Sequence, residues 1–455
     1  MYAMLKQNIK KILKNFYHTK VGQFFWKKFI SIVNRPFIRH VLQKALNIHS
    51  DCSTTKKNVI PIDIDAIDYT KNVLIIFPFW GYDAVTFNIM SMCSSLRKLG
   101  YKIHAIQYNN SDYTPVSEYW DYIYTIKTDQ NNFGKWDIHH DDSSFNRNRI
   151  DDWVYKDLTQ FVKGISRFVD FQICLCNYVF LSKALDSLPA EVFKILYTHD
   201  VFANRNNRMA SEGVSESDFY FSVSSEEEVI GLQRADLVLA IQEEERKYFA
   251  PLVGEEHTGT LPYVPEKKYQ PVREKPSQLV VGYIASGHAP NVKAIRSFCQ
   301  QLAERSDIIL LIAGSICSRL DDMIFSKKGK LLGIVEDIAG FYASCDVIIN
   351  PDTLRSGLKV KCVEALSYGK PLVCTDAASA GIDVRKPYHL ISDSAGCAKY
   401  IEQVADNPHL LVEMAAESRR VYDSFSENYS SFRAFHSYDL AARAKRLACV
   451  QAANK

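Results

Sequence analysis

Short apolar, strand-like runs alternate with helical stretches along this 455-residue chain, and this order constrains the fold more than any other feature of the sequence. In the first series, residues 73–77 end near Gly81, and a helical stretch is followed by Gly100 and a second strand-like run at 102–107. A strand, a helix and a strand in this order form a βαβ unit with parallel strands. Four more strands are predicted in this series, at residues 122–126, 171–175, 192–196 and 237–241.

A second series follows residues 263–275, a charged stretch with several prolines that has the composition of an interdomain linker. Its strands are predicted at 279–284, 308–313, 330–332, 347–349 and 372–375, and its helices at 291–304, 337–344, 358–368 and 395–406. Two such series predict an α/β chain of two Rossmann-like, doubly wound domains that face a ligand-binding cleft. We place these domains at 58–265 and 276–425, with a helical tail at 426–455.

The N-terminal 57 residues are strongly basic. They carry ten Lys, two Arg and one Asp, a net charge of +11, whereas the rest of the chain carries −8. Apolar residues at helical spacing, such as Leu5, Ile9 and Phe16, alternate with lysines, so residues 1–57 are predicted to form a basic amphipathic helical extension. One interpretation is that its helices bind an anionic membrane surface through residues 1–35. The other is that they pack against the body of the protein. The pattern does not distinguish the two.

The sequence contains no run of 18 apolar residues and no signal-peptide pattern, so we expect a cytoplasmic protein, peripheral at the inner face of the membrane if the extension binds lipid. The eleven cysteines form no C-x-x-C pair, and we expect reduced core thiols. The pair Asp63 and Asp65 precedes the first strand, and residues 139–142 are adjacent in a polar loop, so neither set is expected to bind a metal. A P-loop and a G-x-G-x-x-G sequence are both missing, and we expect no cofactor and no nucleic-acid partner.

The segment 350–371 has the strongest chemical pattern in the chain. A predicted strand passes into a loop with Ser356 and Gly357, and then into a helix. The N–H groups at a helix N-terminus favour an anion such as a diphosphate, to which Gly357 allows close approach and Lys359 adds positive charge. Glu364, farther along the helix, has acceptor oxygens for ribose hydroxyls. The alternative is a surface helix whose charges are solvated.

From residue 280 to residue 382 the chain resembles the nucleotide-sugar-binding domain of retaining GT-B glycosyltransferases of the family-4 type, also called glycosyl transferases group 1. The resemblance rests on stretches in matching order and spacing at Gly282, 290–295, 311–314, 332–337, 341–346, 356–359, 364–366 and 368–371. It implies that Glu364 holds the donor ribose. It also implies that backbone N–H groups of Gly357, Leu358 and Lys359 hold the diphosphate, and that the turn of Gly333, Ile334 and Val335 borders the base.

The segment departs from that family in two places. Members often carry a second glutamate, which contacts the transferred sugar, where this chain has Ser356. They also often carry an Arg and a Lys after the first strand of the domain. This chain has Tyr283 and then His288 there, and His288 is a candidate donor-binding residue. Lys359, with Arg355 as a further counter-charge, would then supply the positive charge at the phosphates. These departures leave the identity of the nucleotide and the sugar open.

The N-terminal half resembles the acceptor domain of the same enzymes, through residues 197–205. The family often has a histidine near the transferred sugar, at the position of His199, and Asp200 would orient this histidine or bond the acceptor. Gly81, after the first strand, is a candidate for close approach to the donor. The alternatives are that His199 and Asp200 cap the following turn and that Gly81 is a simple turn glycine.

Together these patterns predict a metal-independent hexosyltransferase that moves a sugar from a nucleotide-sugar to a glycan or lipid-linked acceptor, with retention, in surface polysaccharide or glycoconjugate assembly. His199, Asp200 and Lys359 are the predicted catalytic residues. The alternatives are a sugar-nucleotide epimerase or phosphorylase of the same fold, or a non-catalytic partner subunit that binds a nucleotide-sugar.

Overall fold

The computed structural model describes residues 71–453, apart from 79–83, 109–118, 127–147, 216–220 and 321–328 and the single residues 155, 212, 214 and 356. Several sequence predictions lie outside the described residues. These are the basic extension at 1–57, the Asp63 and His139 motifs, and two candidate donor-site residues, Gly81 and Ser356.

The first domain is built on a parallel sheet with the strand order β3-β2-β1-β4-β5-β6-β7. The strands are β1 (Lys71–Phe77), β2 (Tyr101–Tyr108), β3 (Tyr122–Ile126), β4 (Ile173–Asn177), β5 (Phe193–Tyr197), β6 (Leu237–Ala240) and β7 (Thr258–Thr260). The order reverses at β1 and β4, which is the topological switch point of a doubly wound sheet. Each of the six strands predicted from sequence is present within two residues of its expected bounds. Strand β7 was not predicted, because Thr258-Gly-Thr260 is short and polar.

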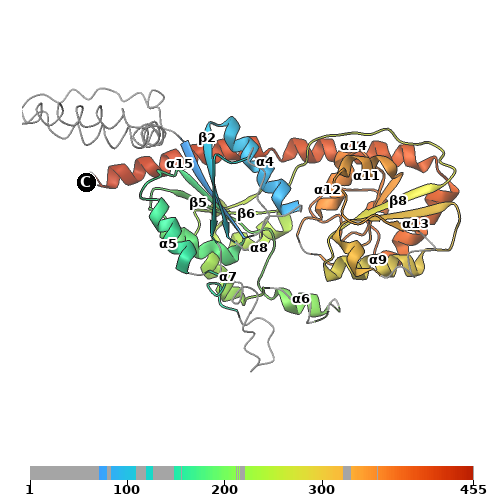
Figure 1. The fold of residues 1–455 in the computed structure, drawn as a ribbon, viewed down its shortest axis with the longest axis horizontal. Coiled ribbons are helices and arrows are strands. Elements are labelled where there is room, and N and C mark those ends of the chain that lie inside the picture. Colours follow the sequence, from blue (N-terminus) through green and yellow to red (C-terminus); the bar gives the residue numbers. More distant parts are fainter. Residues whose placement is uncertain are drawn as a thin grey trace, which may run out of the picture. The chain divides into compact units, whose positions relative to one another are not determined.

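Helices cover both faces of this sheet (Figure 1). The helices of this domain are α4 (Ala84–Lys98), α5 (Lys156–Ile165), the 3₁₀ helix η2 (Val179–Ser187), α6 (Arg205–Ser211), α7 (Ser225–Leu232), α8 (Glu243–Val253) and the 3₁₀ helix η4 (Glu255–His257). Helices α7 and α8 each have three glutamates in their first turn, where negative charge stabilises the helix dipole. Ser224 adds an N-cap to α7, since its side chain accepts the N–H of Glu227 at 3.3 Å.

The second domain contains a parallel sheet with the strand order β10-β9-β8-β11-β12. Its strands are β8 (Leu279–Ile284), β9 (Ile308–Ala313), β10 (Gly329–Leu331), β11 (Val347–Asn350) and β12 (Leu372–Cys374). Its helices are α9 (Ala289–Gln301), η5 (Ser315–Arg319), α11 (Ile338–Ser344), α12 (Val360–Ser367), η6 (Pro387–His389) and α13 (Ser394–Asp406). The predicted strands are present within one residue, and the switch point lies between β8 and β11.

The central strands of both sheets are deeply buried, because helices cover both faces of each sheet. Every residue of β4 is buried, as are residues 73–77 of β1. The described cysteines are all free thiols. Most of them lie in these cores, and Cys317 and Cys449 are partly exposed.

Two long helices complete the chain: α14 (Leu410–Asn428), which packs against α12, and α15 (Ser431–Ala453), which packs against α4 and β5 of the first domain. On α15, the buried carboxylate of Asp439 accepts hydrogen bonds from Lys71 Nζ at 3.1 Å and from Tyr101 Oη at 2.7 Å. Lys445 pairs with Asp236 at 2.7 Å. The last helix is therefore a structural part of the first domain. No helix in the described part of the chain is long and apolar enough to cross a membrane.

Candidate active site

The loop between β11 and α12 (residues 351–359), which we call the donor loop after the sequence prediction, is organised around Asp352. This residue is only 4% exposed, and its Oδ1 accepts the N–H of Leu354 at 3.0 Å. Its Oδ2 pairs with Lys359 Nζ at 3.2 Å. Burial by itself would raise the pKa of Asp352, but Lys359 and Lys361 more than offset this effect, so the pKa is lowered. The ionised Asp352 therefore fixes Lys359, the residue that precedes the first turn of α12.

Lys361, in the first turn of α12, is a candidate that the sequence analysis missed. Its Nζ donates to Asn291 Oδ1 at 2.5 Å and lies 3.5 Å from Tyr283 Oη and 5.2 Å from the centroid of the Tyr283 ring. Burial lowers the pKa of Lys361 to about 8. The amine lies between the end of β8 and the start of α9. The connection between β8 and α9 has Tyr283 and His288 where an Arg and a Lys are often found in the family that the sequence resembles.

Glu364 lies one turn farther along α12 and is partly buried. Its Oε2 accepts a hydrogen bond from Tyr342 Oη at 3.4 Å, and the Tyr342 ring stacks on Tyr368 with 4.4 Å between centroids. Burial raises the pKa of Glu364 to about 7, and the hydrogen bond from Tyr342 only partly offsets this effect. Near neutral pH the carboxyl group is therefore available to hydroxyl partners both as acceptor and as donor.

The turn after β10 is fixed by Gly333. Its φ is +69°, a left-handed conformation that favours glycine, and its carbonyl accepts the N–H of Gly314 at 2.7 Å. The turn leaves Ile334 74% exposed, whereas Val335 packs against the core. An exposed isoleucine beside a rigid turn gives this edge of the domain an apolar surface.

Two other predicted donor-site residues are positioned differently from Lys359. Arg355 pairs with Asp376 at 2.9 Å, and both side chains are exposed. His288 is the N-cap residue of α9, but its side chain makes no capping hydrogen bond. The structure thus brings Lys359 and Lys361 together at Asp352, and it engages Arg355 in a surface ion pair.

In the first domain, His199 follows β5 with φ at +63°, which is uncommon for a residue with a side chain. The imidazole is 7% exposed and stacks on Tyr178 at 4.5 Å between centroids. Asn177 Nδ2 donates to the Ile76 carbonyl, so Asn177 Oδ1 faces His199 Nε2 at 2.9 Å. Nε2 must therefore carry the proton, and Nδ1 is an acceptor. Burial lowers the pKa of His199 to about 3, so the ring stays neutral.

The neighbouring Asp200 has different partners. Its Oδ2 forms an ion pair with Arg205 at 3.0 Å, and its Oδ1 accepts the N–H of Val201 at 2.9 Å. These local bonds fit the capping role that the sequence analysis kept as an alternative. They leave open the predicted contact between Asp200 and an acceptor.

A hydrogen bond connects the first domain with the donor loop. The N–H of Gly357, whose φ is +58°, donates to Glu245 Oε1 on α8 at 3.1 Å. An added Cβ on Gly357 would lie 3.5 Å from the carbonyl oxygen of His199, an ordinary contact distance. Burial, and then the charge of Asp200, raises the pKa of Glu245 to about 8. Glu245 was not predicted as a site residue, because local sequence does not reveal a partner 112 positions away.

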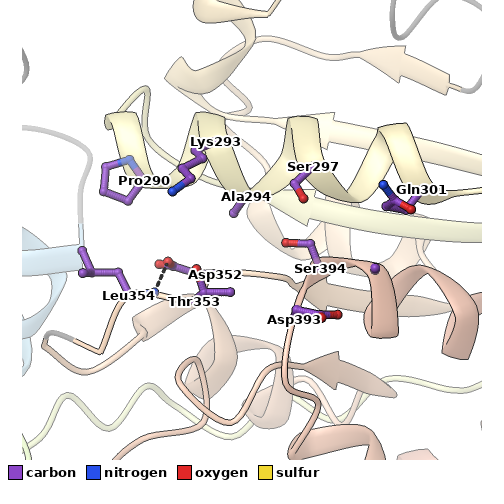
Figure 2. Close-up of a pocket in the computed structure, with 11 residues that line it drawn as sticks. Pro290, Lys293, Ala294, Ser297, Gln301, Asp352, Thr353, Leu354, Asp393 and Ser394 are labelled. Carbon is purple, nitrogen blue, oxygen red and sulfur yellow. Dashed lines mark hydrogen bonds between the residues drawn. The ribbon is translucent and has the colours of Figure 1, made fainter. Parts of the chain in front are cut away.

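A pocket of about 220 Å³ adjoins the donor loop (Figure 2). Residues of α9, including Lys293, form one wall, and residues 352–354 and the start of α13 lie opposite. Ser394 Oγ donates to the Pro351 carbonyl at 3.0 Å, and Asp393 caps α13 by accepting the N–H of Gly396 at 2.7 Å. The pocket thus lies on the α9 and α13 side of the second sheet, next to Asp352. In the part of the chain that the structure describes, no group of three His, Cys, Asp or Glu side chains has the geometry of a metal site.

Residues 278–407 match the family model described as "Glycosyl transferases group 1". No curated protein matches the chain. Among solved structures, sucrose-phosphate synthase from Thermosynechococcus elongatus matches with a TM-score of 0.61 and 14% identity, over 82% of this chain and 100% of that one. The structure of TarM matches with a TM-score of 0.59 and 11% identity, over 82% of this chain and 99% of that one. Anabaena HepE, in complex with UDP and glucose, matches with a TM-score of 0.55 and 13% identity, over 82% of this chain and 100% of that one.

At these identities the structural matches concern the fold. They confirm the predicted class, an α/β chain with two Rossmann-like domains in the GT-B arrangement. The family model covers the second of these domains, from before β8 to the end of α13, and so includes Lys359, Lys361 and Glu364.

Proposed function

We propose that this protein is a glycosyltransferase that moves a sugar from a nucleotide-sugar to a glycan or lipid-linked acceptor, with retention at the anomeric carbon. One observation carries the proposal. Two lysines, Lys359 and Lys361, converge at the N-terminal turn of α12, and Glu364 lies one turn farther along the same helix. Positive charge beside a helix N-terminus suits a diphosphate, and a carboxyl group a turn away suits ribose hydroxyls.

In this mechanism the leaving group is the nucleoside diphosphate. Lys359, Lys361 and the first N–H groups of α12 stabilise the negative charge that develops as the glycosidic bond breaks. Glu364 accepts the ribose hydroxyls, and the apolar edge at Ile334 borders the base. We assign no protein side chain as the nucleophile on the sugar. Retention then depends on the donor phosphate, which assists attack by the acceptor from the same face.

In this proposal His199 accepts a hydrogen bond from the substrate and does not donate a proton. Its ring is neutral, and Nδ1 is the nitrogen left for a ligand, so it suits a hydroxyl of the transferred sugar. Asp200, which is held by Arg205, is the remaining candidate for a bond to the acceptor. Protein cations near the diphosphate offset its charge, and on this ground we propose transfer without a metal.

Two neighbours support a nucleotide-sugar donor. The Anabaena HepE structure was determined with UDP and glucose and also with UDP-glucose. A structure of S. aureus TarM contains α-GlcNAc-glycerol and UDP. We therefore take UDP-sugars as the first donors to test. A lipid-linked acceptor in surface polysaccharide assembly, and a membrane-proximal position through residues 1–35, remain part of the proposal.

The test is release of nucleoside diphosphate from UDP-, GDP- and ADP-linked hexoses, in the presence of membrane or polysaccharide extracts as acceptor. Glu364→Ala should lower turnover at least about tenfold, because the ribose loses a bonded partner in a buried site. Glu304→Ala is the matched control, since this glutamate is exposed between α9 and β9. Undiminished turnover by Glu364→Ala would contradict the site assignment.

The same assay separates the alternatives. A donor that changes its sugar without any acceptor indicates an epimerase. Consumption of a glycan with free phosphate indicates a phosphorylase. Position 356 is a serine where related enzymes often have a glutamate, and this favours a non-catalytic partner subunit as the second candidate. Tight binding of a nucleotide-sugar with no transfer to any extract would support that candidate.

A further inference from the structure

Three of the buried polar atoms of the first domain that have no hydrogen-bond partner among the described residues lie near the ends of β5 and β6. These atoms are His199 Nδ1, Gln242 Oε1 and Glu245 Oε2. The three residues are 7%, 5% and 5% exposed. A buried polar atom without a partner costs about 1–3 kcal/mol, so three in one region indicate a missing partner.

All three side chains follow the ends of neighbouring parallel strands. His199 lies just after β5, and Gln242 and Glu245 lie at the start of α8, just after β6. The carboxyl ends of parallel strands form the ligand-binding edge of a doubly wound sheet. The unpartnered atoms therefore belong to one edge of the first sheet.

This edge reaches the donor loop. Glu245 Oε1 accepts the N–H of Gly357 at 3.1 Å, and Gln242 Nε2 lies 3.4 Å from the same oxygen. An added Cβ on Gly381 would lie 2.9 Å from Gln242 Oε1, so the second domain approaches this amide closely as well. The carboxyl group of Glu245 thus lies beside the residue that follows position 356, where the sequence lacks an acidic residue.

The chemistry of the three atoms selects the kind of partner. His199 Nδ1 can only accept, because its Nε2 donates to Asn177. Gln242 Oε1 accepts, and Glu245 Oε2 accepts when it is ionised. Glu245 Oε1 already has two neighbouring donors, so a bound proton would lie on Oε2 and would also suit a hydroxyl oxygen. A ligand with several hydroxyl groups, as a hexose has, supplies the donors that this set lacks.

We propose that Gln242 and Glu245, together with His199, form a subsite for the hydroxyl groups of the transferred sugar, with Glu245 supplying the carboxyl group that position 356 lacks. This assignment rests on the proposed glycosyl transfer and adds its sugar-specificity residues. Glu245 reaches the sugar from the first domain, so the subsite is complete only when both domains take part.

The experiment separates sugar binding from nucleotide binding. Affinities for UDP-glucose and UDP, and for GDP-mannose and GDP, are measured by calorimetry at pH 8.5, above the pKa of about 8 of Glu245. The variants are Gln242→Met, which keeps the bond between Glu245 and Gly357, and Glu245→Gln, whose amide can keep that bond but places an N–H group at Oε2. Glu244→Gln is the control, because Glu244 is exposed on the same helical turn.

We expect both variants to weaken binding of the nucleotide-sugar at least about tenfold and to leave binding of the nucleoside diphosphate within about twofold. UDP-deoxyglucose donors, each of which lacks one hydroxyl group of the sugar, should show a smaller difference in affinity between wild type and the variants than UDP-glucose does. Equal losses for nucleotide and nucleotide-sugar, or no loss in either variant, would overturn the subsite. Wild-type protein that binds the nucleotides and neither nucleotide-sugar more tightly would overturn the proposed function, and the subsite with it.

Discussion

Lys361 supplies positive charge at the β8–α9 connection, which has no Arg and Lys pair of its own. Its amine contacts Asn291 on α9 and Tyr283 on β8, although the side chain comes from α12. Basic residues are often found in the β8–α9 connection of the glycosyltransferases that this segment resembles. Here the charge at that place comes from a different helix, and together with Lys359 it gives the donor loop two cations beside one buried carboxylate, Asp352.

Replacing Lys361 by Met should weaken binding of UDP or GDP at least about tenfold at pH 7, because one charge-assisted hydrogen bond to a phosphate contributes about 1.5–3 kcal/mol. Calorimetric titration measures the effect. Lys399→Met is the control, since Lys399 is exposed on α13. An affinity for nucleotide equal to that of wild type would mean that Lys361 is only structural.

At the scale of elements, the last helix connects to the first domain through a buried charge. Asp439 on α15 is 5% exposed and bonds Lys71 on β1 and Tyr101 on β2. Its pKa is lowered, because these bonds and the nearby Arg443 outweigh the effect of burial. The 426–455 segment, which the sequence analysis set apart as a tail, thus carries contacts on which the first sheet depends.

We expect Asp439→Ala to lower the free energy of unfolding by about 2–4 kcal/mol, because Lys71 and Tyr101 lose a buried partner. Denaturant-induced unfolding followed by circular dichroism measures this change. Asp383→Asn should change stability by less than about 1 kcal/mol, since its ion pair with Arg385 is exposed on both sides. If Asp439→Ala lowered the free energy of unfolding by less than Asp383→Asn does, α15 would not be anchored through Asp439.

At the scale of the whole molecule, buried histidines lower the stability of the fold as the pH falls, and buried glutamates lower it as the pH rises. Burial lowers the pKa of His104 and His389 to about 4, so the native state binds fewer protons than the unfolded chain below pH 6.5. Stability is therefore lost as the pH falls through this range. Burial raises the pKa of Glu228 and Glu364 to about 7, so the native state binds more protons above pH 4.5. Stability is then lost as the pH rises from 4.5 to about 7.

Glu228 provides the clearest test of the second effect. It is fully buried, and its Oε1 accepts the N–H of Phe202 at 2.6 Å, a bond that a glutamine retains. Relative to wild type, Glu228→Gln should gain about 2–3 kcal/mol of unfolding free energy between pH 5 and pH 8. Denaturation curves at both pH values measure the difference. If the difference in unfolding free energy between Glu228→Gln and wild type were the same at pH 5 and pH 8, this would contradict the assigned pKa. Glu244→Gln, at an exposed position, is the control for the loss of charge alone.

Local patterns alone were enough to predict the secondary structure and much of the donor segment. Apolar runs of strand length, alternating with helices, predicted every strand of the two sheets except β7 within two residues, because strand burial on both faces requires such runs. The segment from β11 through α12 was also predictable. Its loop, glycine and helix start are neighbours in sequence. Lys359 lies directly before α12 and Glu364 lies within it.

Only the tertiary structure decided which charges meet. Lys361 pairs with a residue 70 positions earlier, Glu245 bonds Gly357 across 112 positions, and Asp439 bonds Lys71 across 368. Arg355, a candidate counter-charge for the phosphates, forms an ion pair with Asp376. The periodicity of a sequence specifies which face of an element is buried, because that depends on the element's own residues. It does not specify which two elements bring their polar ends together, because that depends on how the sheets and helices pack.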